Sequence, residues 1–366
     1  MAHVHDHPIY SQAATVHVVR GDDKLETFQR TVEQAGFVQH VLDHWQASGR
    51  PQSEFRIAVK PNIMTASTFQ DDSPVYTDPI LVEALFALLR EAGFTRFSVV
   101  ESQNVYNYAY QGRTVPAVAA MCGYSGNDYA IIDLTADTVD LDYGGALGQH
   151  KAGRAWVESD YRISFAKNKT HWQCYFTACL KNVYGCLPQW DKMRHYHGKT
   201  NRGGDIEFYQ ATILINDVLP VHFAFLDAWI SGDGLTGHVR DAHPNPTHTF
   251  LASTNAYALD WVAGELMRLD PEKNAVIREA MRTWGKPTIT RVGDMTPWKH
   301  WHNVRPIVVR AFDWFEERYW LSRFMSRAAA TEMDPRFPPL GRFAWFFRIC
   351  QAFVRFGERM LARVTE

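Results

Sequence analysis

The chain has 366 residues, of which 46% are hydrophobic and 21% charged, and its 38 basic and 40 acidic residues give a formal net charge of −2. This length can bury a large core, and the nearly balanced charge offers no global field that would attract nucleic acid, so we expect no nucleic-acid partner. The five cysteines, an odd number, argue against a disulfide framework and favour a reducing compartment.

The first residues lack the cationic segment and apolar run of a secretory signal. No uncharged apolar stretch reaches the ~18 residues that a membrane-spanning helix needs. We therefore expect a cytoplasmic protein.

Short apolar runs rich in β-branched residues alternate with segments of helical spacing. The runs predict buried strands at residues 15–19, 56–59, 97–100, 130–134, 161–165 and 222–226. The helical spacing predicts helices at residues 25–45, 79–92, 206–218 and 256–269. Alternating strands and helices predict an α/β fold with a mainly parallel sheet and helices on both faces.

The segment from residue 56 to residue 100 has the form of a βαβ unit. Its helix would be capped by Thr77 or Asp78, with Pro79 at the first helical position. Ligands of such open sheets bind at the carboxyl ends of the strands. Side chains of the kind that bind ligands fall at or just past these ends, namely Lys60, Glu101, Lys167 and Asp227.

The composition changes near residue 306 to aromatic and arginine-rich segments. We predict two amphipathic helices there, separated by the breaker MDPRFPP, and divide the chain into an α/β domain at 1–300 and a helical extension at 301–366. Residues 306–364 could contact a membrane surface or a protein partner. The alternative is that they pack on the α/β domain or on a second copy, and the oligomeric state stays open.

The densest polar segment runs from residue 165 to residue 199. Lysines are rarely buried unless paired, and several converging ammonium groups would bind a carboxylate or a phosphate. We therefore predict one cleft that binds a small anionic molecule through Lys60, Asn62, Lys167, Lys169, Asn182 and His197. For acid–base chemistry we predict Lys181, His171 and Asp227. A solvated loop with scattered charges is the alternative.

A second group of polar residues follows the strand at 222–226. Asp227, Asp233 and His238 surround a glycine-rich turn and could hold a divalent metal. Their spacing matches no standard metal motif. A turn that uses glycine and aspartate for its backbone conformation is the competing explanation.

Three cysteines, Cys174, Cys179 and Cys186, could in principle bind iron or zinc. Their spacing is not that of a recognised cluster, and small core residues are the commoner outcome, so we consider an iron–sulfur cluster unlikely. The P-loop and serine-hydrolase glycine motifs are absent from the chain.

The order of several motifs resembles the family catalogued as domain of unknown function 362. The matching pieces lie between residues 59 and 262 and are VKPNIM, TDPILVEALFALLREAGF with FSVVES, KNKTHWQCYFTACLKNVYGCLP, LDAWISGDGLTGH and FLASTNAYALDWV. Lys181, Asn182 and Gly185 carry most of the resemblance. Some family members look like iron–sulfur proteins through a ferredoxin-type module, whose C-x2-C-x2-C-x3-C run is missing here. This chain also has GDGLTGH where a proline is usual after the second glycine.

Three functions follow from these patterns. The first is an enzyme that binds a small anionic metabolite and performs acid–base chemistry, with or without the help of a divalent metal. The second is a redox or iron–sulfur accessory protein without a standard resident cluster. The third is a non-catalytic binding protein that docks through its C-terminal helices. We favour the first, because converging cations need an anion more than these cysteines need iron.

Overall fold

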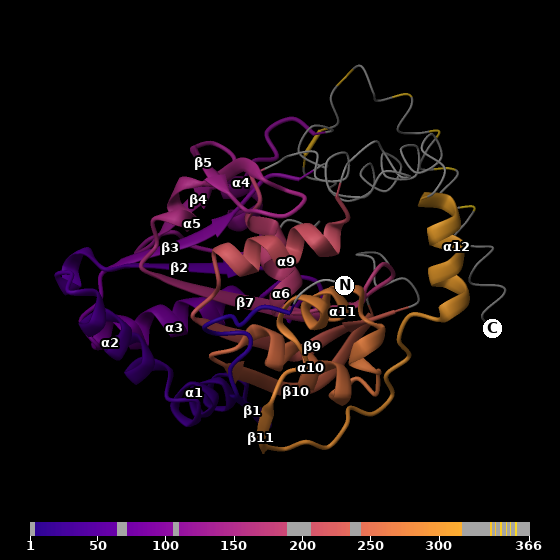
Figure 1. The fold of residues 1–366 in the computed structure, drawn as a ribbon, viewed down its shortest axis with the longest axis horizontal. Coiled ribbons are helices and arrows are strands. Elements are labelled where there is room, and N and C mark those ends of the chain that lie inside the picture. Colours follow the sequence, from indigo (N-terminus) through magenta and orange to yellow (C-terminus); the bar gives the residue numbers. More distant parts are fainter. Residues whose placement is uncertain are drawn as a thin grey trace.

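The computed structural model describes residues 4–63, 72–104, 110–188, 206–234 and 243–316, together with residues 337, 338, 341, 345, 349, 352 and 356. One large sheet forms its centre, with the strand order β11-β1-β10-β9-β7-β2-β3-β4 and with β8 paired to β7 (Figure 1). These strands are β1 (Ala14–Arg20), β2 (Arg56–Pro61), β3 (Arg96–Glu101), β4 (Ala130–Asp133), β7 (Tyr161–His171), β8 (Tyr175–Thr177), β9 (Phe223–Asp233), β10 (His243–Ser253) and β11 (Ile289–Gly293). A separate hairpin consists of β5 (Thr138–Asp142) and β6 (Gln149–Gly153).

The strands that carry the predicted site are parallel to one another. β9, β7, β2, β3 and β4 are neighbours in this order and are all paired in parallel. β10 is antiparallel to β9 and β1, and β11 is parallel to β1. The prediction of a mainly parallel sheet is confirmed, and the carboxyl ends of β2, β7 and β3 lie at one edge.

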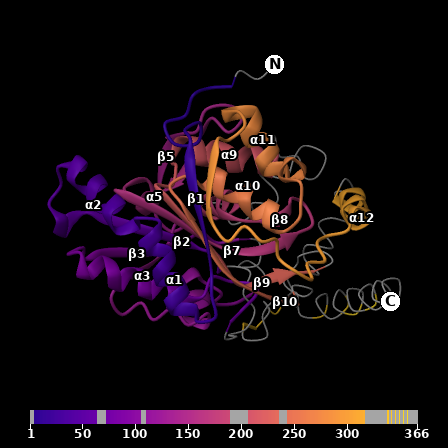
Figure 2. The same cartoon turned by 90° about the horizontal axis from the view of Figure 1, so that it is seen from below.

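Helices cover both faces of the sheet, as Figure 2 shows. One face packs against α1 (Lys24–Gln34), α2 (Phe37–Ser48), α3 (Pro79–Glu91) and α4 (Val115–Met121). The other packs against α6 (Cys179–Val183), α9 (Phe208–Val218), α10 (Ala256–Leu266) and α11 (Ala275–Trp284). Two further helices are α5 (Arg154–Val157) and α12 (Pro306–Glu316), and the short 3₁₀ turns are η1 (Gln52–Glu54), η2 (Tyr184–Cys186) and η3 (Pro271–Lys273).

Local sequence signals explain where several elements begin and end. α3 begins at Pro79, as predicted, and the Asp78 side chain accepts a hydrogen bond from the Ile80 N–H. The helix predicted at residues 25–45 is two helices instead. Gly36 separates them in a left-handed conformation with φ +62°, which a non-glycine residue rarely adopts.

Two central strands are longer than predicted. β7 continues to His171 and β9 to Asp233, so Lys167 and Asp227 lie within their strands instead of past them. The prediction missed β10, because Pro244 and Pro246 resemble strand breakers. The β9–β10 register is irregular just after Pro246, which fits the position of these prolines at one end of the strand.

Candidate functional site

Lys60 is the second-to-last residue of β2, and its side chain is almost completely buried. Its Nζ lies 2.7 Å from Glu101 Oε2, and it donates hydrogen bonds to the Pro61 carbonyl at 2.6 Å and to Asn182 Oδ1 at 3.0 Å. Glu101 is the last residue of β3 and is also buried. Within the protein, the Lys60 charge therefore already has a carboxylate partner, and an ion pair this deeply buried depends on both of its members.

Gly185 lies directly against this ion pair. A Cβ atom at position 185 would lie 2.5 Å from Lys60 Cε and 2.7 Å from Glu101 Oε1, closer than real Cβ atoms approach. The Ser102 hydroxyl donates to the carbonyls of Gly185 and Leu187 and holds this turn in place. A side chain at position 185 would displace the Lys60–Glu101 ion pair, which gives a physical reason for the glycine in the predicted family motif.

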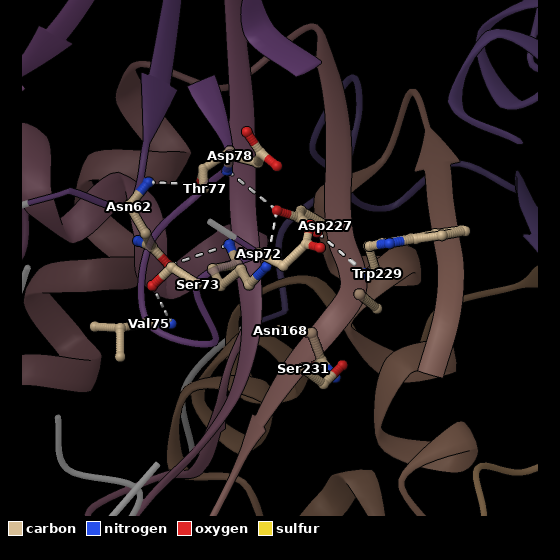
Figure 3. Close-up of polar contacts among 12 residues, drawn as sticks. Asn62, Asp72, Ser73, Val75, Thr77, Asp78, Asn168, Asp227, Trp229 and Ser231 are labelled. Carbon is tan, nitrogen blue, oxygen red and sulfur yellow. Dashed lines mark hydrogen bonds and ion pairs between the residues drawn. The ribbon is translucent and has the colours of Figure 1, made fainter. Parts of the chain in front are cut away.

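Two asparagines connect the ends of β2 and β7 to α6. Asn182 donates through Nδ2 to the Lys60 carbonyl at 2.5 Å and to Ser164 Oγ at 3.1 Å. Asn62 donates to Asn182 Oδ1, and its own Oδ1 accepts the Lys167 N–H at 3.2 Å. Figure 3 shows Asn62 beside Thr77, whose hydroxyl accepts the Asn62 N–H at 2.9 Å. In the structure both asparagines connect three elements, and their predicted role in ligand binding stays a prediction.

Lys167 forms a second buried ion pair, with Asp227 of β9. Lys167 Nζ lies 3.0 Å from Asp227 Oδ2, and both side chains are fully buried. Asp227 also accepts the backbone N–H groups of Asp78 at 3.2 Å and Trp229 at 3.1 Å (Figure 3). Burial raises the pKa of Asp227, and the Lys167 charge opposes that shift.

The Lys60 and Lys167 side chains leave their strands toward opposite faces of the sheet. Successive side chains of a strand alternate between its faces. Lys60 is two positions from Ala58, which packs in the core beneath α6 and α9, whereas Lys167 is two positions from Phe165, which packs in the core beneath α1 and α3. Each of these lysines also has a buried carboxylate partner, and the prediction that both bind one anion stays a prediction.

Lys169 and Lys181 have different electrostatic surroundings from Lys60 and Lys167. Lys169 is buried near the end of β7, where its Nζ donates to the Val75 carbonyl at 3.2 Å. Burial and then the charges of Lys181, Lys167 and Lys60 lower the pKa of Lys169 to about 7. Neutral and charged forms of this amine are thus similarly populated at neutral pH.

Lys181 projects from α6 and is only partly buried. Within the described part of the chain its ammonium group makes no hydrogen bond or ion pair. Burial lowers the pKa of Lys181, the Cys174 thiol opposes this, and the Lys60 charge lowers it further. Lys181 is therefore a cation that meets like charges and no carboxylate, which is the electrostatic setting of an anion site.

The position of α6 depends on a buried carboxylate that the sequence analysis did not identify. Asp260 of α10 accepts the N–H groups of Cys179 at 2.7 Å and Leu180 at 2.9 Å, the first two residues of α6. Burial raises the pKa of Asp260 to about 7. Asp260 therefore fixes the helix that carries Lys181. Nothing in its apolar sequence context indicates this role, whereas Glu101 was recognisable as the end of a predicted strand.

The remaining predicted residues are less informative. His171 ends β7 and its Nδ1 accepts the Gln173 N–H at 3.2 Å. His197 and His238 lie outside the described residues. Asp233 is buried and accepts the backbone N–H groups of His302 at 2.6 Å and Asn303 at 3.0 Å.

The carboxylates assigned to a metal have other partners here. Asp233 binds backbone N–H groups and Asp227 binds Lys167. Among the residues that the structure describes, no group of three His, Cys, Asp or Glu side chains could hold a metal ion. The metal prediction gains no support from these two carboxylates and stays a prediction.

The cysteines near the site are buried thiols. Cys174 Sγ donates to the Phe176 carbonyl at 3.2 Å and Cys179 Sγ to the Phe225 carbonyl at 3.3 Å. Burial raises the pKa of Cys174 to about 12 and that of Cys179 well above its ordinary value. Both thiols are thus buried among core residues, and the prediction about an iron–sulfur cluster stays a prediction.

Comparisons with known proteins show which family the chain belongs to, but they do not show which ligand or reaction it has. A model of the family described as Domain of unknown function (DUF362) matches residues 57–265. The resemblance predicted over residues 59–262 is therefore confirmed. A thylakoid-associated protein of Synechocystis sp. is 26% identical over 231 residues, which cover 59% of this chain and 64% of that protein. The chain thus spans less than two thirds of this relative's length.

Solved structures show weaker similarity. The lactate racemase apoprotein from Thermoanaerobacterium thermosaccharolyticum matches with a TM-score of 0.41 and 12% identity, over 71% of this chain and 58% of that chain. A protein from Thermotoga maritima matches with a TM-score of 0.32 and 14% identity, over 58% of this chain and 52% of that chain. Neither of these two similarities bears on the function of the chain.

The cellular location is not tested by these comparisons, and the predicted cytoplasmic location stays a prediction.

Proposed function

This chain belongs to the DUF362 family. We propose a function for it from the geometry and charges of the lysines at the end of β7. The protein binds a small molecule that carries a carboxylate or phosphate group, at the end of β7 beside α6. Lys181 binds the anionic group, and Lys169 transfers a proton to or from the bound molecule. This assignment keeps the predicted ligand class and changes the roles of the individual lysines.

The observation that carries the proposal is the ammonium group of Lys181. It is partly buried, has no carboxylate among the described residues, and its charge helps to lower the pKa of Lys169. Placing cations together in this way is unfavourable unless an anion joins them. A bound carboxylate or phosphate would remove the repulsion, and its binding would be strengthened by the low-dielectric surroundings.

Lys169 is suited to acid–base work because its pKa lies near neutral pH. A group is most effective in proton transfer when its pKa is close to the working pH. In its neutral form the Lys169 amine can accept a proton from carbon beside a carbonyl group, and the ammonium group so formed can return it. Lys60 and Lys167, already paired with Glu101 and Asp227, hold the strands that present this amine.

Titration calorimetry with pyruvate and with inorganic phosphate tests the binding step. Replacing Lys181 by Met should weaken binding at least ~10-fold, because a charge-assisted contact contributes about 1.5–3 kcal/mol. Lys299→Met is the matched control, since Lys299 is exposed and distant from the strand end in sequence. Equal affinities of the Lys181 variant and the wild type for both probes would refute the proposed anion site.

The same titration carries a proton signature. A bound anion raises the pKa of Lys169, so binding above pH 7 should take up protons, and the affinity should increase as the pH falls toward about 7 and level off below it. Pyruvate suits this measurement because its carboxylate keeps one charge over the range. Proton uptake is measured by repeating the titration in buffers with different ionisation enthalpies, and it should disappear in Lys169→Met.

Deuterium exchange distinguishes a catalyst from a binder. If Lys169 removes a proton beside a carbonyl, the methyl protons of pyruvate should exchange with D₂O faster in the presence of the protein, as followed by NMR. Lys169→Met should abolish this acceleration. Binding of pyruvate without accelerated exchange would leave an anion-binding protein and would remove the acid–base role for this probe.

A further inference from the structure

The part of the chain after β11 presents apolar side chains to solvent in a regular pattern. α12 buries Val304 beside its start and Val308 within its first turn. Ile307 and Trp314 are 72% and 49% exposed, and Ala311 between them is also exposed. These three positions follow the i, i+4, i+7 spacing of one helical face. α12 thus turns one apolar face to the protein and another to water.

Four described residues nearer the C-terminus repeat the pattern. Trp345, Ile349, Ala352 and Phe356 are helical and exposed, with 67%, 46% and 65% exposure for the three large side chains. Their spacing of four, three and four residues is that of one helical face. Figures 1 and 2 both show α12 at the periphery, away from the helices that cover the sheet. Large apolar side chains grouped in this way mark an interaction surface.

The charge of this part of the sequence indicates the kind of partner. Residues 342–363 contain five arginines and one glutamate, with no lysine or aspartate, in a chain whose formal net charge is −2. Tryptophan and phenylalanine beside arginine are typical of helices that lie in the interface of an anionic bilayer. A second copy of the chain would bring like charges together, whereas anionic lipid headgroups would attract them.

We propose that the exposed apolar side chains of α12 and of residues 345–356, namely Ile307, Trp314, Trp345, Ile349 and Phe356, bind peripherally to anionic membrane surfaces. The apolar side chains enter the headgroup region while the arginines of the sequence contact lipid phosphates. Among the residues that the structure describes, none of the helices could span a bilayer. Membrane binding of this kind is independent of the anion site at β7.

Vesicle co-sedimentation of the full chain tests the proposal. Wild-type protein should bind phosphatidylserine/phosphatidylcholine vesicles, and binding should weaken with increasing salt. The double variant Ile307→Ser/Phe356→Ser should bind at least ~10-fold more weakly, because two exposed apolar contacts are lost. The matched control is Leu25→Ser/Ile80→Ser, which changes two side chains with 42% and 43% exposure on α1 and α3 and should bind like the wild type.

Three results would overturn the proposal. They are an absence of binding to the anionic vesicles, equal binding to pure phosphatidylcholine vesicles, and an undiminished affinity of the Ile307/Phe356 variant. Sedimentation equilibrium identifies the alternative partner. A self-association that the Ile307/Phe356 variant loses, without vesicle binding by the wild type, would assign this face to a second copy of the chain.

Discussion

Two sets of lysines at the carboxyl edge of the sheet differ in what surrounds their charges. Lys60 and Lys167 each contact a buried carboxylate, at 2.7 Å and 3.0 Å. Lys169 and Lys181 are influenced mainly by burial and by other lysines. The first set consists of lysines in buried ion pairs, whereas neighbouring lysine charges lower the pKa of both members of the second set. A lysine-rich motif can therefore combine structural and ligand-binding residues that look the same in sequence.

The comparison separates stability from binding. Removing one member of a buried ion pair leaves the other charge buried without a partner. Removing a cation that faces other cations relieves repulsion instead. Substitutions in the first set should thus lower stability, and substitutions in the second should reduce ligand binding while stability is maintained or increased.

The largest expected effect is that of Lys60→Met. It leaves Glu101 buried without its partner and should reduce the free energy of unfolding by about 3–5 kcal/mol, as measured by urea denaturation. The double variant Lys60→Met/Glu101→Gln should recover part of this loss, because no charge then stays buried alone. A Lys60→Met protein as stable as the control Lys299→Met would show that the pair does not matter for the fold.

A smaller loss is expected for Gly185→Ala. The added Cβ would overlap with Lys60 and Glu101, so we expect a destabilisation of about 1–3 kcal/mol, typical of overpacking. Gly341→Ala is the control, because nothing lies within 4 Å of a Cβ built there. Thermal unfolding followed by circular dichroism compares the two variants. A change of similar size in both would contradict the close contact at residue 185.

Local sequence patterns were sufficient to predict much of this architecture. The apolar runs indicated the central strands, and Asp78 with Pro79 indicated the start of α3. The position of Lys60 and Glu101 at strand ends was also predictable, since both follow β-branched runs directly. These features depend on neighbouring residues, which is why sequence alone reveals them.

Features that depend on distant residues were not predictable. Lys60 finds Glu101 and Asn182 at sequence separations of 41 and 122 residues. The face on which Lys167 lies follows from the register of β7 with β9, which shifts between Lys167 and Lys169. No local pattern encodes such a register, so the sequence could indicate a lysine cluster but not which of its members are paired.

The smallest expected change in stability, and the one of opposite sign, is that of Lys169→Met. The folded-state pKa of Lys169, about 7, lies below the ordinary value of 10.5, so folding favours the neutral amine. The wild type then loses stability as the pH falls from the unfolded pKa toward 7, because the unfolded chain binds the proton more tightly. Methionine has no such proton and keeps a similar volume.

Lys169→Met should therefore gain stability relative to the wild type at pH 7, and this advantage should shrink as the pH rises to 10. Urea denaturation at pH 7, 8.5 and 10 measures it, with Lys299→Met as the control whose difference from wild type stays constant. A stability gain at pH 7 together with loss of pyruvate binding would identify Lys169 as a residue kept for its ligand. A loss of stability that does not depend on pH would instead place Lys169 with Lys60 and Lys167 among the lysines that hold the fold together.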